Sequence, residues 1–136
     1  MNTTGSKGKP KNRLRQLWAW TGWGLVCGVM GFSLIPLAQP QIDINNLDKL
    51  EHWLVYATLM VWFAQLYPRR GWYRIALGFF TMGTVLEVLQ GQTGYRTFSY
   101  GDMAANVMGV LGGWVLAATG LSSLLTSLEK RLHSKK

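Results

Sequence analysis

Three polar side chains that can do acid–base chemistry recur every four residues just before the middle of the chain. Asp48, His52 and Tyr56 would lie on one face of a helix, because four residues complete slightly more than one helical turn. A carboxylate one turn from an imidazole can orient the ring, and the imidazole can then act as a general base. This spacing predicts a polar helix face that binds a ligand or moves a proton.

Two later segments hold most of the other polar candidates. Glu87 and Gln90 share one helix face, and Asp102 and Asn106 share another, followed on the same stripe by glycines. Arg96 lies in the loop expected between the two segments. With Glu87 as a general acid and Arg96 stabilising negative charge, the group has the parts of an acid–base site. Asp102 is also well placed as the N-cap of the last long helix, which would explain it without a ligand.

Long segments with almost no charge must position these side chains. The chain has 136 residues, 49% of them hydrophobic and only 15% charged, whereas about a quarter is typical of soluble domains. About 20 apolar residues suffice to cross a bilayer as a helix. We therefore expect an all-α polytopic membrane protein, a four-helix transmembrane bundle with helices at about 17–37, 50–67, 72–90 and 103–124. A soluble bundle would need a polar outer face on every helix, and these segments have few charges to form one.

The two ends of the chain differ from this membrane domain. Residues 1–16 are polar and basic, which predicts a disordered tail; the membrane domain covers 17–125, and 126–136 form a second basic tail. The first apolar run is too long for a signal peptide, so we expect a retained helix. A leucine stripe after the fourth helix predicts either a helix that continues along the membrane surface or a solvated tail. Its members are Leu121, Leu124, Leu125, Leu128 and Leu132.

The positive charges divide unevenly between the two expected sides of the membrane. Five Lys and Arg lie in the N-terminal tail, three follow Pro68 and four lie in the C-terminal tail, whereas Lys49 and Arg96 are alone on the other side. Because cytoplasmic loops carry the excess of Lys and Arg, both termini are predicted to be cytoplasmic and the polar candidates to face outward. Attraction to anionic lipid then explains the net charge of +8, and we expect no nucleic-acid partner.

Small residues and the single cysteine limit other interpretations. Gly24 and Gly28 form one small-residue face and Ala105, Gly109 and Gly113 form another, which predicts close helix packing within the chain or in a homo-oligomer. One cysteine, Cys27, excludes an internal disulfide and a cysteine metal cluster.

A metal site is an open alternative for the polar candidates. Asp48 and His52 at this spacing can reach one ion, with Glu87 or Asp102 completing the set. A single histidine in the group makes zinc the weaker interpretation, so the sequence predicts no metal and no cofactor.

Several of these segments, taken in order, resemble the VanZ-like family of small multi-helix bacterial membrane proteins. The resemblance covers about residues 45–116 and is carried by 48–52 (DKLEH) with Tyr56, 87–90 (EVLQ), 96–98 (RTF) and 102–106 (DMAAN) with Gly109. The family pattern commonly has an acidic residue soon after the RTF group, and Asp102 takes that place here. The namesake of the family is associated with resistance to the glycopeptide teicoplanin. The resemblance therefore implies a membrane location and an envelope role without supplying a reaction.

These observations favour an envelope-associated accessory protein of the bacterial cytoplasmic (inner) membrane. An outward-facing polar pocket would bind a cell-wall precursor or another lipid-linked ligand, and the residues expected to line it are Asp48, Lys49, His52, Tyr56, Glu87, Gln90, Arg96, Asp102 and Asn106. The alternative is an intramembrane enzyme with His52 and Glu87 as acid–base groups and Asp48 as a further catalytic candidate, although no nucleophile is evident. A transporter subunit would have to oligomerise, because the polar groups occupy only one leaflet. A purely structural network, such as Arg96 paired with Glu87, is the remaining explanation.

Overall fold

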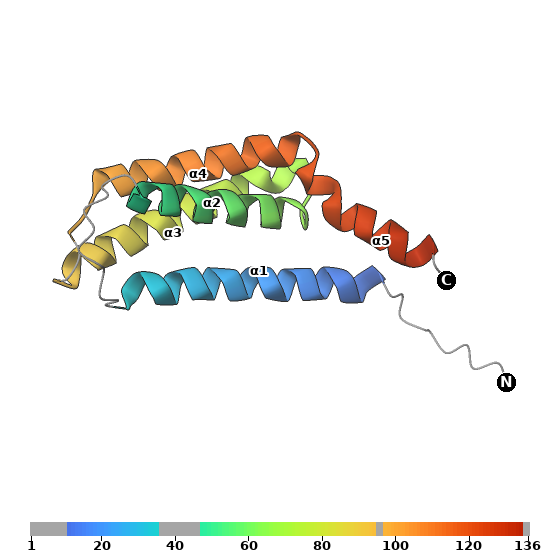
Figure 1. Ribbon diagram of the computed structural model, residues 1–136, viewed down its shortest axis with the longest axis horizontal. Helices are drawn as coiled ribbons and strands as arrows, with labels where there is room; N and C mark the ends of the chain where they lie inside the picture. The colour runs from blue at the N-terminus through green and yellow to red at the C-terminus, as the bar shows by residue number, and fades with distance from the viewer. Residues whose placement is uncertain (1–10, 36–46, 95–96, 135–136) are drawn as a thin grey trace.

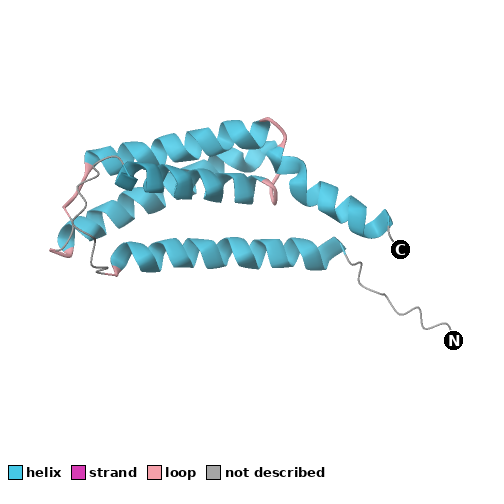
Figure 2. Cartoon of the chain, viewed as in Figure 1, coloured by secondary structure: helices cyan, strands magenta, loops and turns pink. Residues whose placement is uncertain are grey.

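The structure of this protein is a computed structural model that describes residues 11–35, 47–94 and 97–134. Within these ranges it contains helices and short connections, and no strand (Figures 1 and 2). The helices are α1 (Lys11–Leu34), α2 (Leu47–Ala64), α3 (Trp72–Gln92), α4 (Tyr100–Ala118) and α5 (Leu124–Ser134), with 3₁₀ turns η1 (Arg69–Gly71) and η2 (Leu121–Ser123). The prediction of an all-α protein is confirmed.

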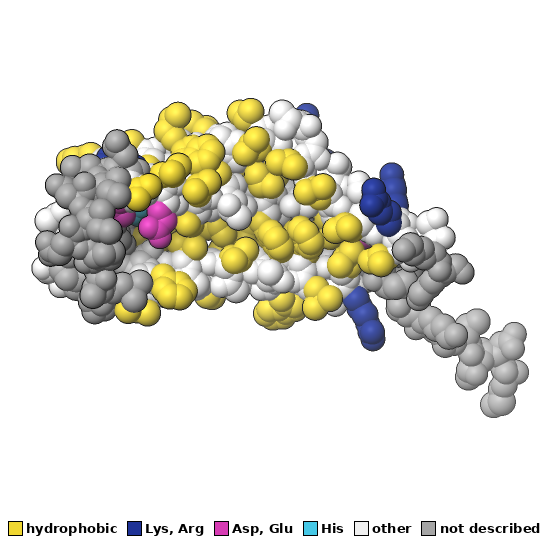
Figure 3. All heavy atoms as spheres, in the orientation of Figure 1, with side chains coloured by type: hydrophobic (Ala, Val, Ile, Leu, Met, Phe, Trp, Pro, Cys, Tyr) yellow, Lys and Arg dark blue, Asp and Glu magenta, His cyan; other side chains and the backbone are white. Residues whose placement is uncertain are grey.

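The helices run roughly along one long axis, so that their ends gather at two opposite ends of the molecule. α2, α3 and α4 pack together and α1 lies alongside them, while α1 begins and α5 ends at the same end (Figure 1). We call the end where α2 and α4 begin the polar end, and the opposite end, with η1 and α5, the basic end. On the face drawn in Figure 3, an acidic side chain is exposed at the polar end and most Lys and Arg side chains at the basic end.

Two glycines of α4 let it approach α2 very closely. A Cβ added at Gly109 would lie 2.5 Å from the carbonyl oxygen of Trp53, and one added at Gly113 would lie 2.5 Å from that of Ala57. Real side chains do not tolerate such distances, so only glycine fits at these two positions. Close packing through Gly109 and Gly113 is therefore confirmed. By contrast, no described residue lies within 4 Å of a Cβ added at Gly24 or Gly28 of α1.

A mostly apolar core lies between the helices. Met60 and Ala117 are fully buried, and ring contacts link α2 to α3 through Phe63 and Phe79, whose centroids are 5.5 Å apart. Buried core side chains from α1 to α4 are Val26, Tyr56, Leu59, Met60, Phe63, Ala64, Trp72, Phe79, Val110 and Ala117. This core fixes α2, α3 and α4 relative to one another.

Helix ends differ from the expected ones at both termini of the chain. α1 begins at Lys11, so residues 11–16 of the predicted disordered tail are helical; Lys, Arg, Gln and Leu, which are good helix formers, make up most of this stretch. α4 ends at Ala118 rather than 124, because Gly120 takes a positive φ of 124° that stops the helix. The last four leucines of the stripe therefore belong to a separate helix, α5, and Leu121 belongs to the turn η2, so the stripe is neither a continuous fourth helix nor an unstructured tail. Leu125 is fully buried there, and the other four leucines of the stripe are exposed.

At the basic end, arginine side chains donate hydrogen bonds to backbone carbonyl oxygens at or just beyond the ends of α2 and α4. Arg15 of α1 donates to the carbonyl oxygen of Leu66 at 2.7 Å, and Arg69 of η1 donates to that of Ala118 at 2.6 Å. Cations at helix C-termini interact favourably with the helix dipole and its unpaired carbonyls. These contacts attach α1 to the end of α2, and η1 to the end of α4.

Within residues 11–35, 47–94 and 97–134, two helices are long and apolar enough to cross a membrane, which is consistent with membrane association. They are Arg13–Leu34 and Tyr100–Ala118, and the core helix of a soluble protein has the same composition. Such a helix would be mostly buried, yet only 11% of the first segment and 33% of the second are buried. α2 and α3 both fall outside this pair, and the 18 residues of α2 include Asp48, Lys49 and Glu51 near its start. The four spans expected from the sequence therefore stay a prediction.

Candidate functional site

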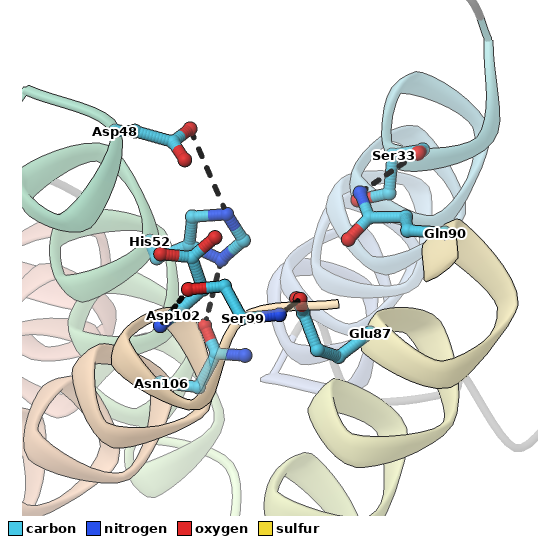
Figure 4. A network of polar contacts seen from close by, with 8 residues as sticks. All are labelled: Ser33, Asp48, His52, Glu87, Gln90, Ser99, Asp102 and Asn106. Carbon is cyan, nitrogen blue, oxygen red and sulfur yellow. Dashed lines mark hydrogen bonds and ion pairs between the residues drawn. The ribbon is translucent and has the colours of Figure 1, made fainter. Parts of the chain in front are cut away.

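Four predicted site residues meet across the α2–α4 contact at the polar end. The Asp48 Oδ1 and the His52 Nε2 of α2 lie 4.0 Å apart, and the His52 Nδ1 lies 2.9 Å from the Asn106 Oδ1 of α4 (Figure 4). The carboxylate of Asp102, also from α4, completes a group with Asp48 and His52 in which one ligand atom of each lies within 4.8 Å of the others. The structure therefore brings together residues that are about 50 positions apart in the sequence.

The contact with Asn106 determines which nitrogen of His52 faces the carboxylates. An amide oxygen only accepts hydrogen bonds, so the His52 Nδ1 carries the proton and donates to the Asn106 Oδ1. In a neutral imidazole the Nε2 then has a free lone pair, and this nitrogen is the one nearest Asp48. Asn106 thus fixes the orientation of the ring through the Nδ1, the nitrogen that does not lie nearest Asp48.

The start of α4 is capped in an unusual way that changes what Asp102 can do. Ser99 is the N-cap, and its Oγ accepts a hydrogen bond from the Asp102 N–H at 3.2 Å. In a complete capping box, the residue at the position of Asp102 would in return accept from the backbone N–H of Ser99. Here that N–H donates instead to the Glu87 Oε1 of α3, at 2.6 Å. Glu87 therefore takes over the capping contact, and the Asp102 side chain can face His52 (Figure 4). The expectation that Asp102 is the N-cap is wrong, because Ser99 has that role.

The remaining predicted residues lie around this group. Gln90 is buried and donates to the backbone carbonyl oxygen of Ser33 in α1 at 2.8 Å, which places it on the α1 side of the network. The buried Tyr56 hydroxyl and the Asn106 Nδ2 both lie within about 3 Å of where a Cβ on Gly83 would be. Gly83 thus gives these two side chains room between α2 and α3.

The two predicted cations have different outcomes. Lys49 is exposed at the edge of the group, and its side chain passes close to Gly101. Arg96 lies outside the described residues, so its expected pairing with Glu87 stays a prediction.

Burial is graded across the polar end. Glu87 is 2% exposed, Asn106 4% and Asp102 6%, whereas the side chain of Asp48 is 40% exposed. A carboxylate is costly to bury without a partner. Glu87 accepts a hydrogen bond from the Ser99 N–H, whereas no described group donates to the Asp102 carboxylate, so Asp102 is the unusual member. The cluster reaches solvent on the Asp48 side.

The geometry does not bring the two proposed acid–base groups together. His52 contacts Asn106 and lies near Asp48, whereas Glu87 contacts the backbone of Ser99. The Ser99 hydroxyl accepts the capping hydrogen bond, and Cys27 is exposed on α1. The arrangement is therefore better suited to binding a cation than to activating a nucleophile.

Sequence reasoning missed Ser99 and Ser33 as parts of this network. Ser99 could have been found, because Ser99 followed three residues later by an acidic residue is a known signature of a helix start. The contribution of Ser33 is a backbone carbonyl, which has no sequence signal.

A hollow of about 890 Å³ lies away from this network, between α1, α2 and α3. It is lined mostly by apolar side chains, among them Trp23, Val26, Phe63 and Phe79, together with Arg70 and Arg74. None of the predicted site residues lines it.

Comparison with known proteins adds no assignment, since no family model, no curated protein and no solved structure matches this chain.

Proposed function

We propose that this chain is a four-span protein of the bacterial cytoplasmic membrane, with both termini inside and the polar end outside. In this proposal it is a VanZ-like accessory protein of the cell envelope, and its polar end binds the head group of a lipid-linked cell-wall component. The observation that carries the proposal is the separation of charge. Buried Glu87, Gln90, Asp102 and Asn106 lie at one end with His52, and most described cations lie at the other.

The surface between the two ends supports the membrane part of the proposal. All four long helices expose large apolar side chains, for example Trp20 on α1, Leu54 on α2, Leu77 on α3 and Val115 on α4, each at least half exposed. Soluble monomers rarely expose apolar surface on every side. The 18 to 24 residues of these helices correspond to about 27–36 Å at ~1.5 Å per residue, close to the thickness of a bilayer core.

The polar end supports the ligand-binding part. Ionisable groups at the membrane are expensive and usually functional. Asp48 is partly exposed while Asp102 lies deeper in the same group, so a ligand arriving from outside would meet Asp48 first.

The topology is tested by cysteine labelling in intact cells. With Cys27 replaced by alanine, Glu51→Cys at the polar end and Arg70→Cys at the basic end form a matched pair, because both positions are exposed. We expect a membrane-impermeant maleimide to label only Glu51→Cys in intact cells, and both variants after permeabilisation. Labelling of Arg70→Cys alone in intact cells would invert the topology, and equal labelling of both would contradict a spanning bundle.

The envelope role is tested by complementation. A deletion strain is compared for teicoplanin susceptibility and envelope integrity after return of the wild type, Asp102→Asn or Glu51→Gln, with membrane abundance matched. We expect Asp102→Asn to fail and Glu51→Gln to complement, because Glu51 is exposed outside the polar group. If the deletion has a phenotype that Asp102→Asn fully restores, the binding site is not at this group.

A further inference from the structure

We infer that Asp48, His52 and Asp102 form a binding site for a divalent transition-metal ion of the zinc type. The inference rests on the proposed function only for the statement that the site faces outward, since the three ligand atoms come from the described helices themselves. A bound ion would give an acidic group the positive charge it needs to hold the phosphate of a lipid-linked ligand.

The donor set fits this class of ion. Zinc is bound in proteins by histidine nitrogen and by Asp or Glu oxygen, and sites with three protein ligands leave a position open for an exogenous ligand. Carboxylate oxygens also suit Mn²⁺, but an imidazole nitrogen shifts the preference towards zinc and its neighbours. The helix spacing of Asp48 and His52 lets both reach one ion, and α4 supplies the third ligand.

Asp102 provides an observation that is independent of the clustering. It is 6% exposed, and across residues 11–35, 47–94 and 97–134 no group donates a hydrogen bond to its carboxylate. The usual local partner of this carboxylate, the Ser99 N–H, is bonded to Glu87 instead. The oxygens of Asp102 keep some contact with solvent, but a carboxylate that is mostly buried and accepts no hydrogen bond from the described residues is still costly, and the side chain is aimed at His52 (Figure 4). A metal ion would provide the missing partner.

The orientation of His52 is a second such observation. Metal-binding histidines usually donate their other ring N–H to a fixed acceptor, which sets the tautomer and the ring angle. The His52 Nδ1 donates to the Asn106 Oδ1 at 2.9 Å, and this leaves the Nε2 for the ion. Asn106 is 4% exposed and cannot easily turn away. Asn106 is therefore a positioning residue for the metal ligand.

The distances require a small closure on binding. Four ligands at about 2.1 Å from a tetrahedral ion lie about 3.4 Å apart, whereas the three atoms here lie within 4.8 Å of one another. Asp48 lies in the first turn of α2 and its side chain is 40% exposed, so the closure would be a movement of this side chain toward His52. Asp102 and His52 are more deeply buried.

The test is titration of the purified, chelator-treated protein in detergent with Zn²⁺, followed by calorimetry, and with Co²⁺, followed by its visible absorption. We expect one saturable ion per chain. Asp102→Asn should weaken binding by at least roughly tenfold, and Asn106→Ala by about 10–100-fold through loss of the fixed ring orientation. Glu51→Gln is the matched control, because it makes the same charge change on α2 outside the group, and should leave affinity within about twofold of wild type. Asp48→Asn is the second ligand variant, chosen because its exposed side chain makes a folding defect less of a concern.

The outcomes separate this inference from the proposed function. An absence of saturable binding, or equal affinity of Asp102→Asn and Glu51→Gln, overturns the metal site. Metal binding without any envelope phenotype of Asp102→Asn would retain the site and remove the proposed function. An envelope phenotype of Asp102→Asn without metal binding to the wild type would retain the proposed function and remove the metal site.

Discussion

The contact of α2 with α4 and the contact of α1 with its neighbours represent two different ways of packing helices in the same chain. α2 and α4 approach until backbone touches backbone, at Gly109 and Gly113. Among residues 13–34 of α1, only Gly22 and Val26 are buried, and Trp20 and Trp23 remain exposed. The α2–α4 contact is fixed by the close fit of the two backbones. The contact of α1 with its neighbours depends on a few side chains and hydrogen bonds.

This difference explains where the candidate site lies. On α4, Asp102, Asn106, Gly109 and Gly113 follow one another on one face, so the polar group and the close contact belong to the same stripe. The glycines set the distance between the helices, and the polar residues then meet the start of α2 across it. α1 reaches the network through a single described hydrogen bond, from Gln90 to the carbonyl oxygen of Ser33.

The largest effect is expected from Gly109→Ala, which attacks the close contact directly. The added Cβ would meet the backbone oxygen of Trp53 at 2.5 Å, and a backbone atom cannot turn aside. We expect a loss of about 1–3 kcal/mol in the free energy of unfolding, together with weaker Zn²⁺ binding because the helices separate beneath the site. Thermal unfolding in detergent and metal titration measure the two effects. A variant with unchanged unfolding temperature would mean that the glycine contact does not set the helix spacing.

Glu87→Ala is expected to have the next largest effect, because it removes the acceptor for the Ser99 N–H. Glu87 is 2% exposed and accepts this hydrogen bond at 2.6 Å. We expect about 1–3 kcal/mol of destabilisation and faster hydrogen exchange at the Ser99 amide. Glu87→Gln keeps an acceptor oxygen in the same place and should recover much of the loss. Equal instability of the two variants would show that the charge of Glu87, and not this hydrogen bond, stabilises the start of α4.

The sequence was sufficient to predict the helices and most members of the polar group, for identifiable reasons. Uncharged runs of helical length gave the approximate positions of α1 to α4. The four-residue spacings placed Asp48 with His52, and Asp102 with Asn106, on common faces. The glycine stripe of α4 predicted its close packing.

Other features depend on contacts that local pattern does not encode. The exchange of capping partners, in which Glu87 replaces Asp102 at the Ser99 N–H, joins two helices across a loop. The open space around Gly24 and Gly28 could not be distinguished from the close contact at Gly109 by spacing alone. The early start of α1 is accompanied by the contact of Arg15 with the end of α2, 51 residues away.

Arg15→Gln tests the attachment of α1 and should have a smaller effect. It removes a hydrogen bond of 2.7 Å from the guanidinium to the Leu66 carbonyl oxygen, at a partly buried position. We expect about 1 kcal/mol of destabilisation, seen as a lower unfolding temperature, without a change in Zn²⁺ affinity. Arg13→Gln is the matched control, because Arg13 is exposed two residues earlier on the same helix. If both substitutions have the same effect, the net charge of the tail matters and the specific contact does not.

The smallest effect is expected from Gly24→Ala, the counterpart of Gly109→Ala on the other type of helix surface. No described residue lies within 4 Å of the added Cβ, so nothing in the chain has to move, and alanine favours a helix over glycine by up to ~1 kcal/mol. The unfolding temperature should stay the same or rise slightly. A clear fall would mean that this face of α1 packs against something outside the chain, and a second copy would be the first to examine.

Cys27 is exposed between Gly24 and Gly28 on the same helix, so oxidative cross-linking of the wild type in membranes would detect that copy directly. Loss of the cross-link in Gly24→Leu, with the fold retained, would then assign the role of the α1 glycines to assembly, in contrast to the role of the α4 glycines in building the site.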